Sequence, residues 1–137
     1  MTFETLELVL GLTDSRRILI IEDNLSFALR LRGFLIKKDH IVHTYTGVER
    51  QGNRLLGIEP LWPEDPDEIN LGDYQVCFLD HYFAGRDFNG STFLGVLANY
   101  PIKVCGMSSV DSANESMRRC GALTSLRKDK LDQLLTL

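Results

Sequence analysis

The chain has 137 residues, of which 44% are hydrophobic and 25% are charged, a balance typical of one globular domain with its own core. Its formal net charge of −4 argues against nucleic acid as the main partner, because nucleic-acid-binding domains are usually basic. We also expect no membrane partner, since no apolar run approaches the length of a bilayer span and the acidic N-terminus is wrong for a signal peptide.

Residues 1–16 form an extension in front of the domain. Phe3, Leu6 and Leu10 recur at helical spacing and Gly11 follows as a stop, so we expect a short amphipathic helix. Two roles stay open for its apolar face: packing against the body of the domain, or self-association that would give a homodimer.

From residue 17 to residue 137, short apolar runs alternate with amphipathic segments, which is typical of successive βα units. The first half predicts a strand over 18–21, a helix over 24–38, a strand over 40–45 and a short helix over 48–56. The second half predicts a strand over 74–80, a turn over 81–90, a helix over 91–99, a strand over 102–107, a helix over 111–120, a strand over 122–126 and a last helix through Leu135.

The segment 57–72 breaks this rhythm and is predicted to be an inserted loop. Pro60, Pro63 and Pro66 interrupt any helix there, and acidic residues gather without a compensating base. We interpret it as a solvated excursion with Trp62 tucked against the body. The alternative is a partner-binding insertion in which Trp62 is an aromatic anchor.

Three cysteines, Cys77, Cys105 and Cys120, lie in or beside apolar segments, and no two of them have the spacing of metal ligands. We therefore expect small buried hydrophobic residues in a reducing compartment. This predicts a cytoplasmic protein.

The strand that ends at Asp80 is the most informative part of the sequence. Its apolar run fits a strand buried on both faces of a parallel sheet, and the carboxyl edge of such a sheet is where ligands bind. A lone Asp after a strand can also simply start a turn. A second strand with an acidic end, at Glu22 and Asp23, favours a shared site instead.

The two remaining strands of the second half deliver Ser108 and Lys128 to the same edge. Three carboxylates in one crevice repel each other unless cations enter, and Mg²⁺ suits such a site because it prefers oxygen ligands. Asp80 would then accept a phosphoryl group as a nucleophile, while Mg²⁺ and Lys128 neutralise the charge of the transferring group.

This ordered set of residues resembles the receiver (CheY-like) domain of two-component response regulators. The stretch Ile-Leu-Ile-Ile-Glu-Asp-Asn at 18–24 is similar to the acidic opening of that family, and Phe-Leu-Asp at 78–80 to its phosphoacceptor strand. Ile-Lys-Val-Cys-Gly-Met-Ser-Ser at 102–109 resembles its hydroxyl-bearing strand, and Gly-Ala-Leu-Thr-Ser-Leu-Arg-Lys at 121–128 its lysine signature. The resemblance covers about residues 17–137.

The resemblance implies an α/β, flavodoxin-like, doubly wound fold with a five-stranded parallel sheet in the order 2-1-3-4-5 and helices on both faces. It implies that Asp80 is the phosphoacceptor, that Asp23 and Asp80 bind the metal directly, that Glu22 acts through water and that the backbone carbonyl of Tyr82 completes the metal ligands. Ser108 and Lys128 would bind the phosphoryl group and act in the switch.

The implied function is that of a stand-alone phosphorelay receiver. A histidine kinase or a phosphotransfer protein would be the donor, and a downstream protein of unknown identity would dock near the fourth helix and fifth strand. Only self-phosphorylation and self-dephosphorylation are expected, so the chain would not be an enzyme in the usual sense.

The sequence departs from the family pattern beside the expected site. Asp129 follows Lys128 where receivers usually have a cis proline, so we expect a trans linkage that can aim Lys128 differently. Ser125 stands where receivers place a switching aromatic residue. His81 lies in a longer turn beside the acceptor, and we expect it to face water rather than the phosphoryl group.

Two other functions stay open. A degenerate, receiver-like interaction module that is not phosphorylated would explain Asp129 and Ser125, although the five polar residues at the strand ends argue against it. An aspartate-based, Mg²⁺-dependent phosphohydrolase would also use a strand-end Asp. Such enzymes place a second Asp two residues after the nucleophile, where this chain has Tyr82.

Overall fold

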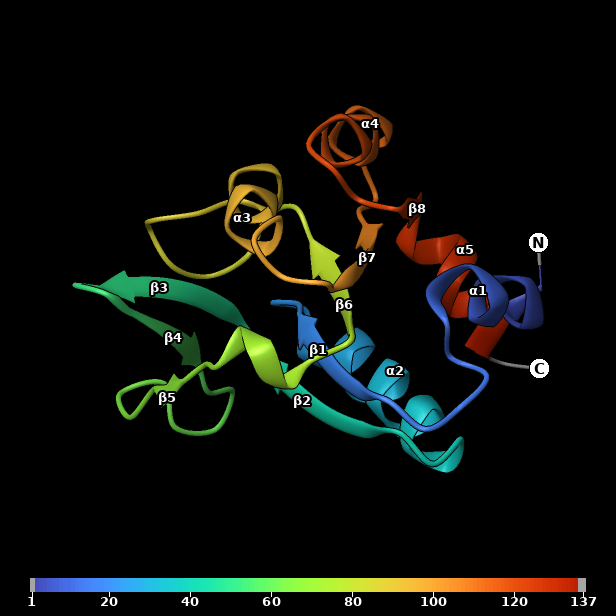
Figure 1. The fold of residues 1–137 in the computed structure, drawn as a ribbon, viewed down its shortest axis with the longest axis horizontal. Coiled ribbons are helices and arrows are strands. Elements are labelled where there is room, and N and C mark those ends of the chain that lie inside the picture. The colour runs from blue at the N-terminus through green and yellow to red at the C-terminus, as the bar shows by residue number, and fades with distance from the viewer. Residues whose placement is uncertain (1, 136–137) are drawn as a thin grey trace.

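Five parallel strands form the main sheet of the protein, which a computed structural model describes over residues 2–135 (Figure 1). Their order across the sheet is β2-β1-β6-β7-β8, so the predicted order 2-1-3-4-5 is confirmed. The strands are β1 (Arg17–Ile21), β2 (Ile41–Tyr45), β6 (Val76–Asp80), β7 (Lys103–Met107) and β8 (Thr124–Leu126).

Helices cover both faces of this sheet, as predicted. One face carries α1 (Phe3–Leu10), α2 (Leu25–Lys37) and α5 (Lys128–Leu135), and the other carries α3 (Gly90–Leu97) and α4 (Asp111–Arg119) (Figure 1). Successive residues of a strand point to opposite faces, and in β1 Ile18 and Ile20 join one core cluster while Leu19 and Ile21 join the other. This two-sided burial explains why the strands are unbroken apolar runs.

Helix α1 packs against the body of the domain. The Thr2 hydroxyl accepts a hydrogen bond from the Thr5 amide at its start, and Gly11 ends the helix in the left-handed region. Its apolar residues Phe3, Leu6 and Leu10 are buried in the same cluster as α2 and α5. Of the two roles left open for this face, the structure supports packing, and a homodimer stays a prediction.

The predicted helix over 48–56 is wrong. The chain forms instead an antiparallel hairpin of β3 (Gly47–Gln51) and β4 (Arg54–Ile58). Gly52 and Asn53 supply a two-residue hairpin turn, and Gly52 has a φ of 61°, a conformation that favours glycine. Local turn chemistry therefore overrode the helical spacing of the apolar residues.

The predicted loop over 57–72 is shorter than expected, because β4 extends to Ile58 and two further short elements follow. These are β5 (Asp67–Glu68), which pairs with β4, and the 3-10 helix η1 (Leu71–Asp73). The side chain of Trp62 is 63% exposed, so the expectation that it tucks against the body is wrong.

Two smaller observations complete the description of the fold. Cys77 and Cys105 are buried as expected, but Cys120 is exposed because it follows α4 at the surface. Among the described residues, no helix is both long enough and apolar enough to cross a membrane.

Candidate functional site

The carboxyl ends of β1, β6, β7 and β8 lie level with one another and define the candidate site. The sheet pairs Ile21 with Leu79, Asp80 with Met107, and Met107 with Leu126. Four of the predicted site residues stand at or directly beyond these strand ends: Glu22, Asp80, Ser108 and Lys128. The alternation of strands and helices in the sequence thus places these residues at one edge.

Lys128 joins the two buried carboxylates of the site. Its Nζ lies 2.9 Å from Glu22 Oε2 and 3.1 Å from Asp80 Oδ2. Glu22 is fully buried and Asp80 is 2% exposed. The Lys128–Asp129 peptide bond is trans, as expected, but the expectation that Lys128 is aimed differently is wrong, because its amine reaches both acids.

Burial changes the ionisation of these groups. Desolvation raises the pKa of Glu22 above its ordinary value, although Lys128 opposes the shift. Desolvation, followed by repulsion from Glu22, raises the pKa of Asp80 to about 8. Desolvation also pulls down the pKa of Lys128, but the two carboxylates together outweigh it and leave this pKa above its usual range.

Asp23 adds an exposed carboxylate to the buried pair. Glu22, Asp23 and Asp80 each offer an oxygen, and these oxygens lie within 4.8 Å of one another. Among the described residues, Glu22 Oε1 is buried without a hydrogen-bond partner and Asp80 Oδ2 accepts no hydrogen bond, despite its ion pair with Lys128. Three acids against one lysine, with unpartnered oxygens, fit a hard divalent cation such as Mg²⁺.

Ser108 is buried directly after β7, and its loop is held in place by α4. The Val110 amide donates to Ser108 Oγ over 3.1 Å, and the Asn114 side chain donates to the Ser108 carbonyl over 3.0 Å. The hydroxyl proton of Ser108 has no acceptor among the described residues. This side chain therefore retains one hydrogen-bond donor.

The two residues after Asp80 point in different directions. Tyr82 is 59% exposed, whereas His81 is 8% exposed, so the expectation that His81 faces water is wrong. His81 Nε2 lies 3.0 Å from Ser91 Oγ, which in turn lies 2.7 Å from Ser116 Oγ. This chain of hydrogen bonds links the end of β6 to α3 and α4.

Gly90 and Asn114 contribute to the site in ways that the sequence did not reveal. A Cβ on Gly90 would lie 2.5 Å from the Asp80 carbonyl oxygen, so only glycine lets α3 approach the acceptor strand so closely. The turn signal at Asn89 and Gly90 marked the start of the helix but not this contact. Asn114 lies in an ordinary helical pattern of the sequence, and that pattern did not indicate its hydrogen bond to the Ser108 carbonyl.

Ser125 lies on β8 at the outer edge of the main sheet. Its hydroxyl accepts a hydrogen bond from the Arg118 side chain of α4. A charged side chain from the neighbouring helix thus contacts the position where receivers carry an aromatic residue.

Comparison with solved structures identifies the fold. A two-component response regulator from Clostridium difficile gives a TM-score of 0.57 at 17% identity, over 90% of this chain and 97% of that one. NtrX from Brucella abortus gives 0.60 at 17% identity, over 90% of this chain and 26% of NtrX. A response regulator from Burkholderia pseudomallei, with a phosphorylated aspartic acid, calcium and citrate, gives 0.58 at 14% identity, over 89% of this chain and 66% of that one.

The chain therefore has the receiver-domain fold of response regulators. At the level of sequence, no protein-family model matches it and no curated protein is significantly similar to it. The likeness at these identities defines the architecture, and function has to be argued from the site itself.

Proposed function

We propose that this chain is a receiver domain that accepts a phosphoryl group on Asp80 in a Mg²⁺-dependent phosphorelay. The observation that carries the proposal is the ion pairing of one lysine with two buried carboxylates, at 2.9 Å and 3.1 Å, beside the third acid, Asp23. A lysine that spans two buried acids serves phosphoryl transfer well, because that reaction requires positive charge around a carboxylate nucleophile.

Glu22, Asp23 and Asp80, with the backbone carbonyl of Tyr82, would hold the metal ion. When bound, Mg²⁺ supplies positive charge that offsets the acids and the incoming phosphoryl oxygens. A carboxylate oxygen of Asp80 forms the new bond to phosphorus, while the bond to the donor nitrogen breaks and its electron pair stays on the donor histidine. The donor would be a histidine kinase or a phosphotransfer protein.

The other residues of the site respond to the new phosphoryl group. Lys128 pairs with its oxygens in place of the Asp80 carboxylate, and Ser108 donates its free hydroxyl proton to one of them. The group adds about −1.5 to −2 of charge and three acceptor oxygens. Because Asn114 ties the Ser108 loop to α4, movement of this loop would change the surface of α4 and β8 and thereby the affinity for a partner protein.

Mass spectrometry after incubation with acetyl phosphate tests the proposal. We expect one added phosphoryl group in the presence of Mg²⁺ and none in EDTA. Asp80→Asn should remain unlabelled, whereas the matched control Asp65→Asn, at an exposed position of the inserted segment, should be labelled like the parent. Labelling of Asp80→Asn to the parental extent would mean that another residue is the acceptor.

Thermal unfolding in a Mg²⁺ titration tests the metal site separately. A ligand that binds only the folded state raises its stability, by about 2.7 kcal/mol at a concentration one hundred times the Kd. Asp23→Asn should abolish this gain with little change in the metal-free protein, because Asp23 is exposed. A melting temperature that stays constant up to millimolar Mg²⁺ would contradict the metal assignment.

One observation favours a second candidate, an interaction module that is not phosphorylated. Strand β8 contains no aromatic side chain that could move in response to Ser108. Ser125, at the position where receivers have that aromatic residue, instead accepts a hydrogen bond from Arg118. In that case the labelling experiment yields unmodified protein in every condition, and the partner binds Asp80→Asn as well as the parent.

A further inference from the structure

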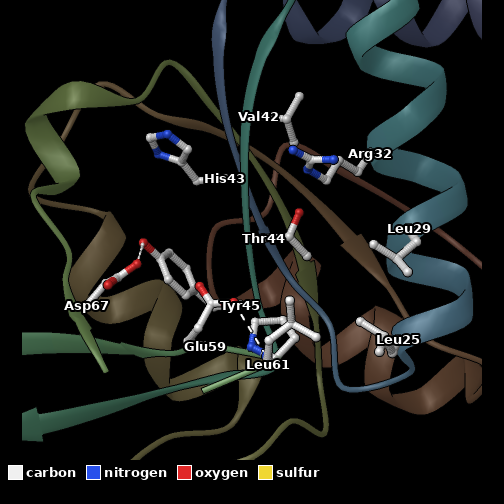
Figure 2. Close-up of a pocket in the computed structure, with 11 residues that line it drawn as sticks. Leu25, Leu29, Arg32, Val42, His43, Thr44, Tyr45, Glu59, Leu61 and Asp67 are labelled. Atoms are coloured by element: carbon white, nitrogen blue, oxygen red, sulfur yellow. Dashed lines mark hydrogen bonds between the residues drawn. The ribbon is translucent and has the colours of Figure 1, made fainter. Parts of the chain in front are cut away.

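A groove of about 500 Å³ runs along β2, which is one edge strand of the main sheet. Helix α2 forms one wall with Leu25 and Leu29, and the segment after β4 forms the other with Glu59, Leu61 and Asp67 (Figure 2). Strand β1 separates β2 from β6 and Asp80. The groove is therefore distinct from the candidate phosphorylation site.

The floor of the groove is the unpaired side of a β-strand. Ile41 donates its amide to the Arg16 carbonyl over 2.9 Å, and the Tyr45 carbonyl accepts from the Glu22 amide over 2.9 Å. Because residues of a strand alternate in the side to which they bond, Val42 and Thr44 direct their N–H and C=O groups away from β1. Among the described residues, these groups have no backbone partner.

The next outward amide along this edge is already paired with another segment of the same chain. Thr46 donates its N–H to the Ile58 carbonyl over 2.9 Å, so the end of β4 already extends the edge by one bond. Beyond Ile58 the chain borders the groove with Glu59, Pro60 and Leu61, and within the described residues no strand pairs with the outer edge of β2. An exposed edge of this kind can pair with a strand from another protein.

The α2 wall of the groove is accessible and carries two leucines together with one charged residue, Arg32 (Figure 2). Leu25 is 38% exposed and Leu29 is 51% exposed, and Leu61 on the facing wall is 72% exposed. The side chains of an added strand alternate between the two faces of the sheet. One set would therefore contact α2, and the other would face Tyr45 and Asp67.

Charge distinguishes the second wall. Glu59 and Asp67 line it, and among the described residues neither has an ion-pair partner, although the Tyr45 hydroxyl donates to Asp67 over 3.2 Å. This wall therefore complements basic side chains. A second copy of this chain offers none through its own edge, because Ile41–Tyr45 contains no lysine or arginine.

We propose that the β2 edge binds an extended segment of a partner protein by strand addition. The segment bonds to the outward backbone groups of Val42 and Thr44. It places apolar side chains against Leu25 and Leu29, and basic side chains against Glu59 and Asp67. The interaction does not depend on phosphorylation of Asp80.

A blocked peptide of alternating valine and lysine is a suitable probe, with amide hydrogen exchange followed by NMR. We expect saturating peptide to slow exchange at Val42 and Thr44 and to leave Ile41, which already bonds to β1, unchanged. A peptide of alternating valine and glutamate should bind about tenfold more weakly or worse, because like charges oppose each other across the interface.

Two sets of variants sharpen the test. Thr44→Pro removes an outward N–H without touching the bonds to β1, a position where an edge strand tolerates proline, whereas Thr44→Val retains the N–H. We expect binding to be lost in the first and kept in the second. Glu59→Gln combined with Asp67→Asn should reduce the affinity for the valine–lysine peptide to that for the valine–glutamate peptide.

The proposal is overturned if saturating peptide leaves Val42 and Thr44 unprotected, or if the lysine and glutamate peptides bind equally. It is also overturned, in favour of a second copy, if both amides become protected without peptide as the protein dimerises at higher concentration. Asp80→Asn should bind the peptide like the parent. Exchange in the unmodified protein decides the matter even if Thr44→Pro fails to fold.

Discussion

The strand-end site and the segment between β2 and β6 place their charges in opposite ways. At the strand ends, two carboxylates are buried around a single lysine. In the intervening segment, acidic side chains such as Glu64 and Asp65 lie in water, and the ion pair of Glu68 with Arg54 spans 3.5 Å between side chains that are more than half exposed.

This difference determines how much a substitution of a charged residue changes the free energy of unfolding. Charges in water are screened and contribute little individually. Buried charges depend on each other, because removal of one partner leaves the rest without compensation. The strand-end site is therefore costly to maintain in the absence of ligands, which is expected of a functional site and not of a purely structural one.

Replacement of Lys128 should have the largest effect. Lys128→Met leaves Glu22 and Asp80 as an uncompensated buried pair, and we expect the free energy of unfolding to fall by about 3 kcal/mol. Lys130→Met, two residues along the same helix at an exposed position, is the control and should change it by less than about 0.5 kcal/mol. Urea unfolding at pH 9, above the pKa of about 8 of Asp80, measures both. Equal losses in the two variants would show that the buried ion pairs of Lys128 contribute no more to the free energy of unfolding than an exposed lysine does.

Crowding at the start of α3 should have the next largest effect. The Cβ of Gly90→Ala would lie 2.5 Å from the Asp80 carbonyl and 2.8 Å from His81 Cα, and such overpacking costs about 2 kcal/mol. Gly95→Ala in the same helix meets nothing within 4 Å and should stabilise the protein by about 0.5 kcal/mol. Thermal unfolding of the two variants should shift in opposite directions, and a common direction would contradict the close approach of α3 to β6.

The regular part of the fold could be predicted because its signals are long and repeated. Strand-like segments, apolar without a break at 18–21 and 76–79, identified the parallel sheet. The polar residues at or just beyond the strand ends identified Glu22, Asp80, Ser108 and Lys128 as neighbours. The turn at Gly52 and Asn53 was missed because the apolar residues on either side, Val48 and Leu55, also fit the spacing of a helix.

Side-chain directions at the site could not be predicted in the same way. The orientation of His81 depends on Ser91 of α3, which contacts it, and on Ser116 of α4, which in turn contacts Ser91. The aim of Lys128 was misjudged for a similar reason: the attraction of two buried carboxylates outweighs a change in the residue that follows it. Both features depend on tertiary contacts that no local pattern encodes.

Substitutions in the two regions should also differ in their effect on the pH dependence of stability: a change at the strand-end site should alter it, and a change in the exposed segment should not. Because the pKa of Asp80 is raised from 3.8 to about 8, the folded protein retains a proton that the unfolded chain releases. Stability in EDTA should therefore fall as the pH rises between these values. Asp80→Asn should lose less stability than the parent between pH 5 and 8, by at least about 1.4 kcal/mol, the equivalent of one pKa unit.

The same experiment has a control in the exposed segment. Asp65→Asn should leave the slope of stability against pH unchanged. Mg²⁺ should restore stability most strongly at the alkaline end, because metal binding requires ionised carboxylates. A parent protein that becomes more stable from pH 5 to 8 in EDTA would contradict the raised pKa of the buried Asp80.

The smallest effect is expected at the hairpin turn, which tests whether the two regions are energetically independent. Gly52 has a φ of 61° and no atom within 4 Å of the position of a Cβ, so Gly52→Ala pays only for its backbone conformation, at most about 1 kcal/mol. Gly52→Asn should cost less, because asparagine tolerates the left-handed region. Both variants should accept a phosphoryl group at the parental rate, since the hairpin contributes none of the charged groups at the strand ends. A slower rate in Gly52→Ala alone would instead mean that strain in the hairpin reaches Asp80, most directly through the hydrogen bond of Ala84 to Thr46.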